Sequence, residues 1–207
     1  MNKSVSVPPQ NGIRIDLDVI QNWVRDRSRV LDLGCGDGTL LKRLQGTKQV
    51  EGYGLEIGAE QITACIAKGV NVIEQDIDKG LHNLDDKSFD TVIMTQALQA
   101  LHYPHLVLDE MLRVGKECVI TFPNFGHWKA RLYLALRGRM PVSDLLPYEW
   151  YDTPNIHFCT FKDFEVLCRQ KGITILHRQV VAEGKLRSLK DLRPNLFGET
   201  AIYHLTK

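Results

Sequence analysis

The sequence predicts a single α/β domain over residues 1–207, in which helices cover both faces of a mostly parallel sheet. Strand-like apolar runs alternate with helical periodicity from residue 29 to residue 122, and such alternation is typical of parallel strands joined by right-handed crossovers. A cluster of glycines follows the first apolar run, in "VLDLGCGDGTLL" (residues 30–41). The length of 207 residues suits one core of ordinary size.

The strands are expected near 29–33, 49–56, 71–75, 89–95, 117–122, 173–181 and 201–207. Helices are expected at 15–24, 38–45, 58–68, 104–113 and 161–171, after a flexible start at residues 1–12. The remaining stretch, 123–160, is an insertion. Loops of that length are usually functional or form a cap, so we expect a cap over the site.

Composition and charge exclude several classes of protein. Lys and Arg number 26 against 25 Asp and Glu, so the overall charge favours neither a nucleic acid nor an acidic membrane surface. No apolar stretch approaches the ~20 residues of a membrane span, and the polar N-terminus lacks the apolar core of a secretory signal. The five cysteines are widely spaced, which predicts free thiols, a cytoplasmic location and no metal site.

The glycine cluster indicates a ligand site. Gly34, Gly36 and Gly38 follow the first strand at alternate positions, at the edge where open parallel sheets bind ligands. Glycine allows close approach of the main chain to a ligand and positive φ, and a tight turn alone would not need three. The third glycine comes too soon after the second for a dinucleotide motif, and no Gly-Lys-Ser/Thr follows. NAD is therefore disfavoured, and a P-loop is excluded.

With Asp32 two residues before the first glycine, the D-x-G-x-G-x-G pattern resembles motif I of class I S-adenosylmethionine-dependent methyltransferases. The resemblance implies a Rossmann-like fold with a seven-stranded sheet whose last two strands are antiparallel. It implies S-adenosylmethionine as ligand, and S-adenosylhomocysteine as product if the chain is catalytic. Asp32 would orient the amino group of the ligand. Cys35 lies in the loop, and we expect its thiol to pack against the strand.

Three later segments match the same family in order. Glu56, after the second strand, would accept hydrogen bonds from both ribose hydroxyls; an acid at a helix start is the alternative. After the third strand, Asp76 and Ile77 match the adenine site, although Asp76 is also a suitable turn residue. Thr95 and Gln96, after the fourth strand, would line the methionine moiety. The full set carried over is Asp32, Gly34, Cys35, Gly36, Gly38, Glu56, Ile57, Asp76, Ile77, Thr95 and Gln96.

The insertion with its flanking residues holds nine of the sixteen aromatic side chains. Four basic residues and no acid occur between residues 118 and 143. This stretch therefore forms either a positive lid over the site or a docking face of aromatic and arginine side chains. The alternative is an ordinary amphipathic helix, with Trp128, Leu132, Ala135 and Leu136 facing inward.

Longer motifs resemble a narrower family. "LDLGCGDGTLL", "TQALQAL", "FPNFGHW", "RGRMPVS" and "WYDTPNIHFCTFKDFE" are together similar to the MetW family of methionine biosynthesis proteins, and the likeness extends over nearly the whole chain from about Ile15. The resemblance implies a cytoplasmic bacterial protein that works with a homoserine O-acyltransferase.

Two functions stay open. Methyl transfer depends on positioning and sometimes on a base; His127 is the first candidate for a catalytic base, and His102, His105, Tyr151 and His157 are the others. The second function is a non-catalytic regulatory subunit that senses S-adenosylmethionine, the downstream product of methionine, and favours one state of the acyltransferase. A small anionic acceptor suits the local arginines better than a nucleic acid does.

Overall fold

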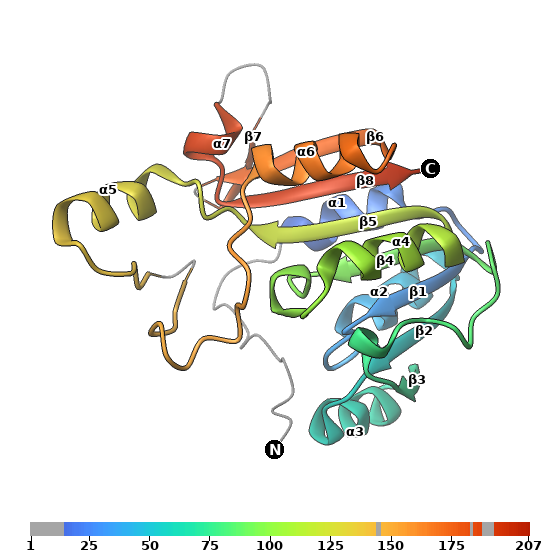
Figure 1. The fold of residues 1–207 in the computed structure, drawn as a ribbon. Helices are drawn as coiled ribbons and strands as arrows, with labels where there is room; N and C mark the ends of the chain where they lie inside the picture. The colour runs from blue at the N-terminus through green and yellow to red at the C-terminus, as the bar shows by residue number, and fades with distance from the viewer. Residues whose placement is uncertain (1–14, 144–145, 183, 188–192) are drawn as a thin grey trace.

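Figure 1 shows the computed structural model, which describes residues 15–143, 146–182, 184–187 and 193–207. Within these residues, eight strands form one sheet in the order β3-β2-β1-β4-β5-β8-β6-β7. The predicted flexible start at 1–12 lies outside the described residues. No helix of the described part is long and apolar enough to cross a membrane.

The first five strands are parallel and lie close to their predicted positions. They are β1 (Arg29–Leu33), β2 (Glu51–Glu56), β3 (Asn71–Glu74), β4 (Phe89–Thr95) and β5 (Gly115–Pro123). The chain adds β2 and β3 on one side of β1, and then β4 and β5 on the other side. The strand order therefore reverses between β1 and β4, where open α/β sheets bind ligands beyond the carboxyl ends of the strands.

The last strands complete the sheet in the antiparallel direction. β6 (Thr174–Ala182) and β8 (Thr200–Thr206) pair antiparallel with each other, as predicted, and β8 also pairs antiparallel with β5. The prediction of seven strands misses β7 (Lys185–Arg187), an exposed strand at the sheet edge. Three exposed residues are too few to show an alternating pattern. A short helix, α7 (Pro194–Phe197), precedes β8 and was also missed.

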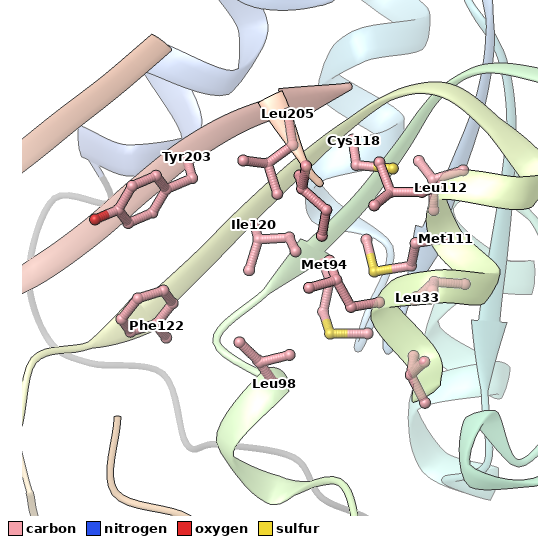
Figure 2. Packing of buried hydrophobic residues seen from close by; sticks show 14 of the residues in the cluster. Leu33, Met94, Leu98, Met111, Leu112, Cys118, Ile120, Phe122, Tyr203 and Leu205 are labelled. Carbon is pink, nitrogen blue, oxygen red and sulfur yellow. The ribbon is translucent and has the colours of Figure 1, made fainter. Parts of the chain in front are cut away.

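Helices cover both faces of the sheet, and each face buries its own apolar cluster. One face carries α1 (Ile15–Trp23), α2 (Thr39–Lys48) and α3 (Ala59–Ala67), and the other carries α4 (Pro104–Val114) and α6 (Phe161–Gln170). Figure 2 shows part of the second cluster, in which Met111 and Leu112 of α4 pack over strand residues such as Ile120. All of these helices had been predicted.

The helix of the insertion, α5 (Trp128–Arg137), extends beyond the sheet (Figure 1), and none of its residues is buried. The side that was expected to face inward is exposed, and it comprises Trp128, Leu132, Ala135 and Leu136. The partly covered side contains Ala130 and Tyr133 instead. The prediction is wrong because spacing locates an apolar stripe without showing what covers it.

The far end of the insertion returns to the sheet. The backbone N–H groups of Ile156 and His157 both donate to the carbonyl of Gln99, each at 2.9 Å. Gln99 belongs to the 3-10 helix η2 (Leu98–Ala100), shortly after β4. The insertion is therefore fastened beside the carboxyl end of β4.

Gly54 in β2 leaves room for the thiol of Cys35. A Cβ at position 54 would lie 2.3 Å from Cys35 Sγ and 2.9 Å from Cys35 Cβ. We therefore expect Gly54→Ala to lower the free energy of unfolding by about 1–3 kcal/mol, the usual cost of overpacking. Urea unfolding followed by circular dichroism measures this change.

Gly46→Ala in α2 is the matched control, because a Cβ at position 46 would meet nothing within 4 Å. Alanine is a better helix former than glycine, so this variant should gain roughly 0.5–1 kcal/mol. If both variants change stability equally, the contact between Gly54 and Cys35 is not the cause.

Candidate functional site

The glycine loop bends over the end of β2. The φ angles of Gly34, Gly36 and Gly38 are +71°, +55° and +74°, in the left-handed region that other residues rarely adopt. The amides of Gly34 and Cys35 both donate to the carbonyl of Leu55, at 2.9 and 3.1 Å. A Cβ at Gly36 would meet nothing within 4 Å. As far as the described residues go, the main chain at Gly36 therefore borders open space, where a ligand can approach it.

The buried carboxylate of Glu56 holds this loop in place. Its Oε2 accepts from the amide of Gly36 at 2.9 Å, and its Oε1 accepts from the amides of Ile57 and Gly58 at 2.9 and 3.0 Å. An ionised carboxylate offers about four acceptor positions, so about one is left for a ligand hydroxyl. Contact with both ribose hydroxyls stays a prediction. It needs two free acceptor positions on Glu56, so the Gly36 amide would have to give up its hydrogen bond to Oε2.

Two side chains of the loop itself, those of Cys35 and Asp37, also shape it. Burial raises the pKa of the Cys35 thiol, whose Sγ lies 3.8 Å from Cys65 Sγ. The thiol is therefore an uncharged packing group.

The pKa of Asp37 lies below its usual range, because hydrogen bonds from Lys68 and Thr39 outweigh the opposing effect of burial. The carboxylate pairs with Lys68 Nζ at 2.5 Å and accepts the Thr39 amide at the start of α2 at 3.1 Å. Sequence reasoning did not single out Asp37.

Loops from the ends of β3 and β4 meet the glycine loop at Gly34. A Cβ at Gly34 would lie 3.5 Å from Ala97 Cβ and 3.9 Å from Ile77 Cδ1. Ile77 is itself buried in the core, so only an edge of its side chain is left for an adenine ring. The structure therefore brings together the predicted elements after β1, β3 and β4.

Asp76 has a local structural role. Its Oδ1 accepts from the amide of Asp78 at 3.1 Å and caps the 3-10 helix η1 (Ile77–Lys79). Its Oδ2 lies 3.7 Å from Nζ of the exposed Lys79. Oδ1 thus has the turn role that was the alternative. Among the described residues Oδ2 makes this long ion pair alone, and its contact with the adenine amine stays a prediction.

The turn after β4 is strained. Gln96 has a φ of +55°, which costs a residue with a side chain about 1 kcal/mol or more. Its amide donates to the carbonyl of Thr121 at 3.0 Å, and its carbonyl accepts from Nε2 of Gln99 at 2.7 Å. Gln99 is buried, and its Oε1 has no hydrogen-bond partner within the described residues. Strain and unsatisfied buried acceptors cluster at functional sites, and Gln99 in "TQALQAL" was overlooked as a site residue.

His127, the candidate base, lies on the β5 side of the sheet. It precedes α5 as its N-cap, and its amide donates to the carbonyl of Asn124 at 3.2 Å. Its side chain lines a cavity of about 140 Å³ together with Tyr133 and Glu199. Burial lowers the pKa of His127, so the imidazole is neutral at pH 7 and can accept a proton. These neighbours lie just after β5, in α5 and just before β8. No described contact joins His127 to the glycine loop.

Two other histidines lie closer to the end of β3. His102 Nδ1 is 2.8 Å from Asp78 Oδ2, and His157 Nε2 is 3.3 Å from the carbonyl of His102. Tyr151 is exposed. The described residues contain no group of three or more His, Cys, Asp or Glu side chains that could hold a metal ion.

A model of the MetW family, described as methionine biosynthesis protein MetW, matches residues 14–205. The chain belongs to the MetW family of methionine biosynthesis proteins. The resemblance carried by the sequence motifs is thereby confirmed.

One relative joins a MetW-family part to a second part. The bifunctional methionine biosynthesis protein MetXA/MetW of Rhodopirellula baltica is 33% identical over 208 residues, which cover 95% of this chain and 33% of that protein. The chain thus spans about a third of the length of this curated relative.

Solved structures share the fold of this MetW-family chain. A SAM-dependent methyltransferase from Archaeoglobus fulgidus has a TM-score of 0.70 at 19% identity, and the match covers 93% of this chain and 92% of that one. An S-adenosylmethionine-dependent methyltransferase from Mesorhizobium loti has a TM-score of 0.68 at 17% identity, with 93% and 96% covered. At this identity the likeness shows the fold alone, and it confirms the predicted class I methyltransferase fold.

The strain at Gln96 predicts an unusual gain from glycine. We expect Gln96→Gly to raise the free energy of unfolding by about 1 kcal/mol, because the relief of left-handed strain exceeds the entropic cost of a glycine. Thr95→Gly, one residue earlier in β4, is the control and should lose roughly 0.5–1 kcal/mol or more. Urea unfolding of both variants measures the difference, and an equal loss in the two would show that the turn is unstrained.

Proposed function

We propose that this chain binds S-adenosylmethionine at the carboxyl ends of β1 to β4 and acts in methionine biosynthesis together with a homoserine O-acyltransferase. The glycine loop carries the proposal. Its three glycines have positive φ, and the Gly36 amide donates to the Glu56 carboxylate. Among the described residues, Gly36 borders open space beside the reversal of strand order. A nucleoside with an amino-acid tail and no phosphate suits such a loop. Such a ligand needs a main chain that its tail can approach closely and a carboxylate that accepts hydrogen bonds from its ribose hydroxyls.

The proposed roles follow the strand ends. Asp32 and the glycine loop hold the amino-acid tail, Glu56 accepts a ribose hydroxyl, and Asp76 contacts the adenine amine. The remaining contacts assigned to the ligand are Cys35, Ile57, Ile77, Thr95 and Gln96. The bound ligand supplies a methyl group activated on a sulfonium. The chain itself orients that ligand, and His127 takes a proton from an acceptor held in the neighbouring cavity.

A second function, sensing of S-adenosylmethionine without catalysis, is favoured by two observations. In the Rhodopirellula baltica relative, the MetW part and the MetXA part form one bifunctional chain. In addition, the neighbours of His127 lie just after β5, in α5 and just before β8. A binding subunit needs no base, because it acts by favouring one state of its partner.

Calorimetric titration with S-adenosylmethionine and S-adenosylhomocysteine tests the binding site. We expect micromolar binding by the wild-type chain and a loss of tenfold or more, about 1.4 kcal/mol, in Gly36→Val and in Glu56→Ala. Valine fills the open space above the loop, and alanine at position 56 releases the loop.

Gly172→Val is the matched control. Gly172 has a φ of +66° and open space around its Cβ position, as Gly36 has, but it follows α6. This variant carries comparable strain and should keep the wild-type affinity. Failure of the wild-type chain to bind either ligand, even with the acyltransferase present, would contradict the proposal.

An acyltransferase assay at saturating S-adenosylmethionine separates the two functions. A sensor should change the acyltransferase rate without forming S-adenosylhomocysteine, and Glu56→Ala should abolish that change. A methyltransferase should form S-adenosylhomocysteine in proportion to a methylated acceptor. An unchanged acyltransferase rate over the whole titration would rule out the sensor.

A further inference from the structure

The helix α5 presents an apolar stripe that nothing in the described part of the chain covers. Trp128, Leu132 and Leu136 lie four residues apart, hence on one side of the helix, and their exposed fractions are 40%, 47% and 76%. Such spacing normally marks a buried side. Contiguous exposed apolar surface of this kind marks interaction sites in soluble proteins.

The helix is nevertheless held at its base. The Arg131 side chain donates to the carbonyl of Gly126 at 2.5 Å and to that of Asn195 at 3.1 Å. Buried Asn124, just before the helix, donates through Nδ2 to the carbonyl of Gly198 at 2.7 Å and accepts the Gly126 amide at 2.9 Å. These bonds tie α5 to the segment before β8, so the apolar stripe is presented in a defined orientation.

Aromatic and basic side chains extend this surface. Trp150 and Tyr151 are 73% and 71% exposed, and Trp150 shares the wall of a small pocket with Met140 and Pro141, just beyond the end of α5. The guanidinium of Arg137 lies 5.3 Å from the centre of the Tyr133 ring. Trp, Tyr and Arg are the side chains that most often dominate binding energy at protein interfaces.

The charge of α5 and of the residues just beyond its end is positive, whereas the exposed Glu149 and Asp152 flank Trp150 and Tyr151. Lys129, Arg137 and Arg139 form no ion pair with another described residue. No Asp or Glu occurs between residues 118 and 143. The complementary surface therefore carries apolar side chains surrounded by carboxylates.

We propose that the stripe of α5, with Trp150 and Arg137 at its margins, is the docking surface for the acyltransferase chain. The inference rests on the proposed partnership, and the fused relative supports this occupant because about two thirds of that protein lies outside the match. Two parts of one chain meet at high effective concentration. The acyltransferase docks on α5 through an apolar patch rimmed by acidic residues, beside the ligand site and outside it.

The test measures the affinity of the purified acyltransferase for the full-length chain by calorimetry. Leu132→Glu and Leu136→Glu should each weaken binding by about tenfold or more, since each places a charge in the apolar centre of the interface. Leu106→Glu, on the similarly exposed Leu106 of α4, is the matched control and should stay within about twofold of the wild type. All three variants should keep the wild-type affinity for S-adenosylmethionine, which also reports that they fold.

Charge reversal tests the acidic complement separately. Arg137→Glu with Arg139→Glu should weaken binding of the acyltransferase and reverse its salt dependence, because the attraction that salt screens becomes a repulsion that salt relieves. Arg169→Glu on α6 changes another exposed arginine. This control should leave the affinity for the acyltransferase and its salt dependence unchanged.

The outcomes distinguish this inference from the proposed function. If the acyltransferase binds the wild-type chain and the α5 variants equally, the docking surface is elsewhere and the partnership stands. If sedimentation shows a dimer of this chain that Leu136→Glu dissociates while acyltransferase binding persists, a second copy occupies α5 and the inference is overturned. If the acyltransferase does not bind the wild-type chain at all, both the docking inference and the proposed partnership are overturned.

Discussion

The arrangement of the site depends on one buried carboxylate. Glu56 ends β2, and its two oxygens accept amides from the glycine loop and from the turn into α3. A buried charge is costly unless hydrogen bonds compensate it, and three N–H groups do so here. Because these amides come from both loops, the carboxylate sets the distance between the loop after β1 and the loop after β2. The glycines make this possible, since other residues rarely adopt their positive φ angles and would strain the loop that brings the Gly36 amide to Glu56.

A second set of bonds organises the insertion. Its start is anchored by Asn124 against the segment before β8, and its end by Gln99, which accepts two amides of the returning chain. Between these anchors α5 has no buried residue. The insertion is therefore fixed at both ends and open in the middle. Because both anchors lie outside α5, the structure at the carboxyl ends of the strands does not depend on whether a partner covers the helix.

Most of the fold and part of the site could be predicted from the sequence. Buried parallel strands are continuous apolar runs bounded by glycine or helical patterns, so β1 and β4 were placed at their observed limits. β7 was missed because a short exposed edge strand leaves no such pattern. The outward side of α5 was assigned wrongly, since burial depends on what packs against a helix. The bonds of Glu56 to the loop depend on geometry that spacing does not contain.

The close fit between Gly54 and Cys35 constrains how this family varies. Gly54 lies within β2 and Cys35 in the loop after β1, 19 positions apart in the chain. A Cβ at position 54 would nevertheless overlap the thiol at position 35. Any larger residue in β2 must therefore be accompanied by a smaller one in the loop. Alanine at position 35 would remove the thiol but leave its Cβ 2.9 Å from a Cβ at position 54. Related chains should therefore change these positions together and keep glycine at one of the two. Co-variation of positions 35 and 54 would thus indicate an intact loop independently of Gly34, Gly36 and Gly38.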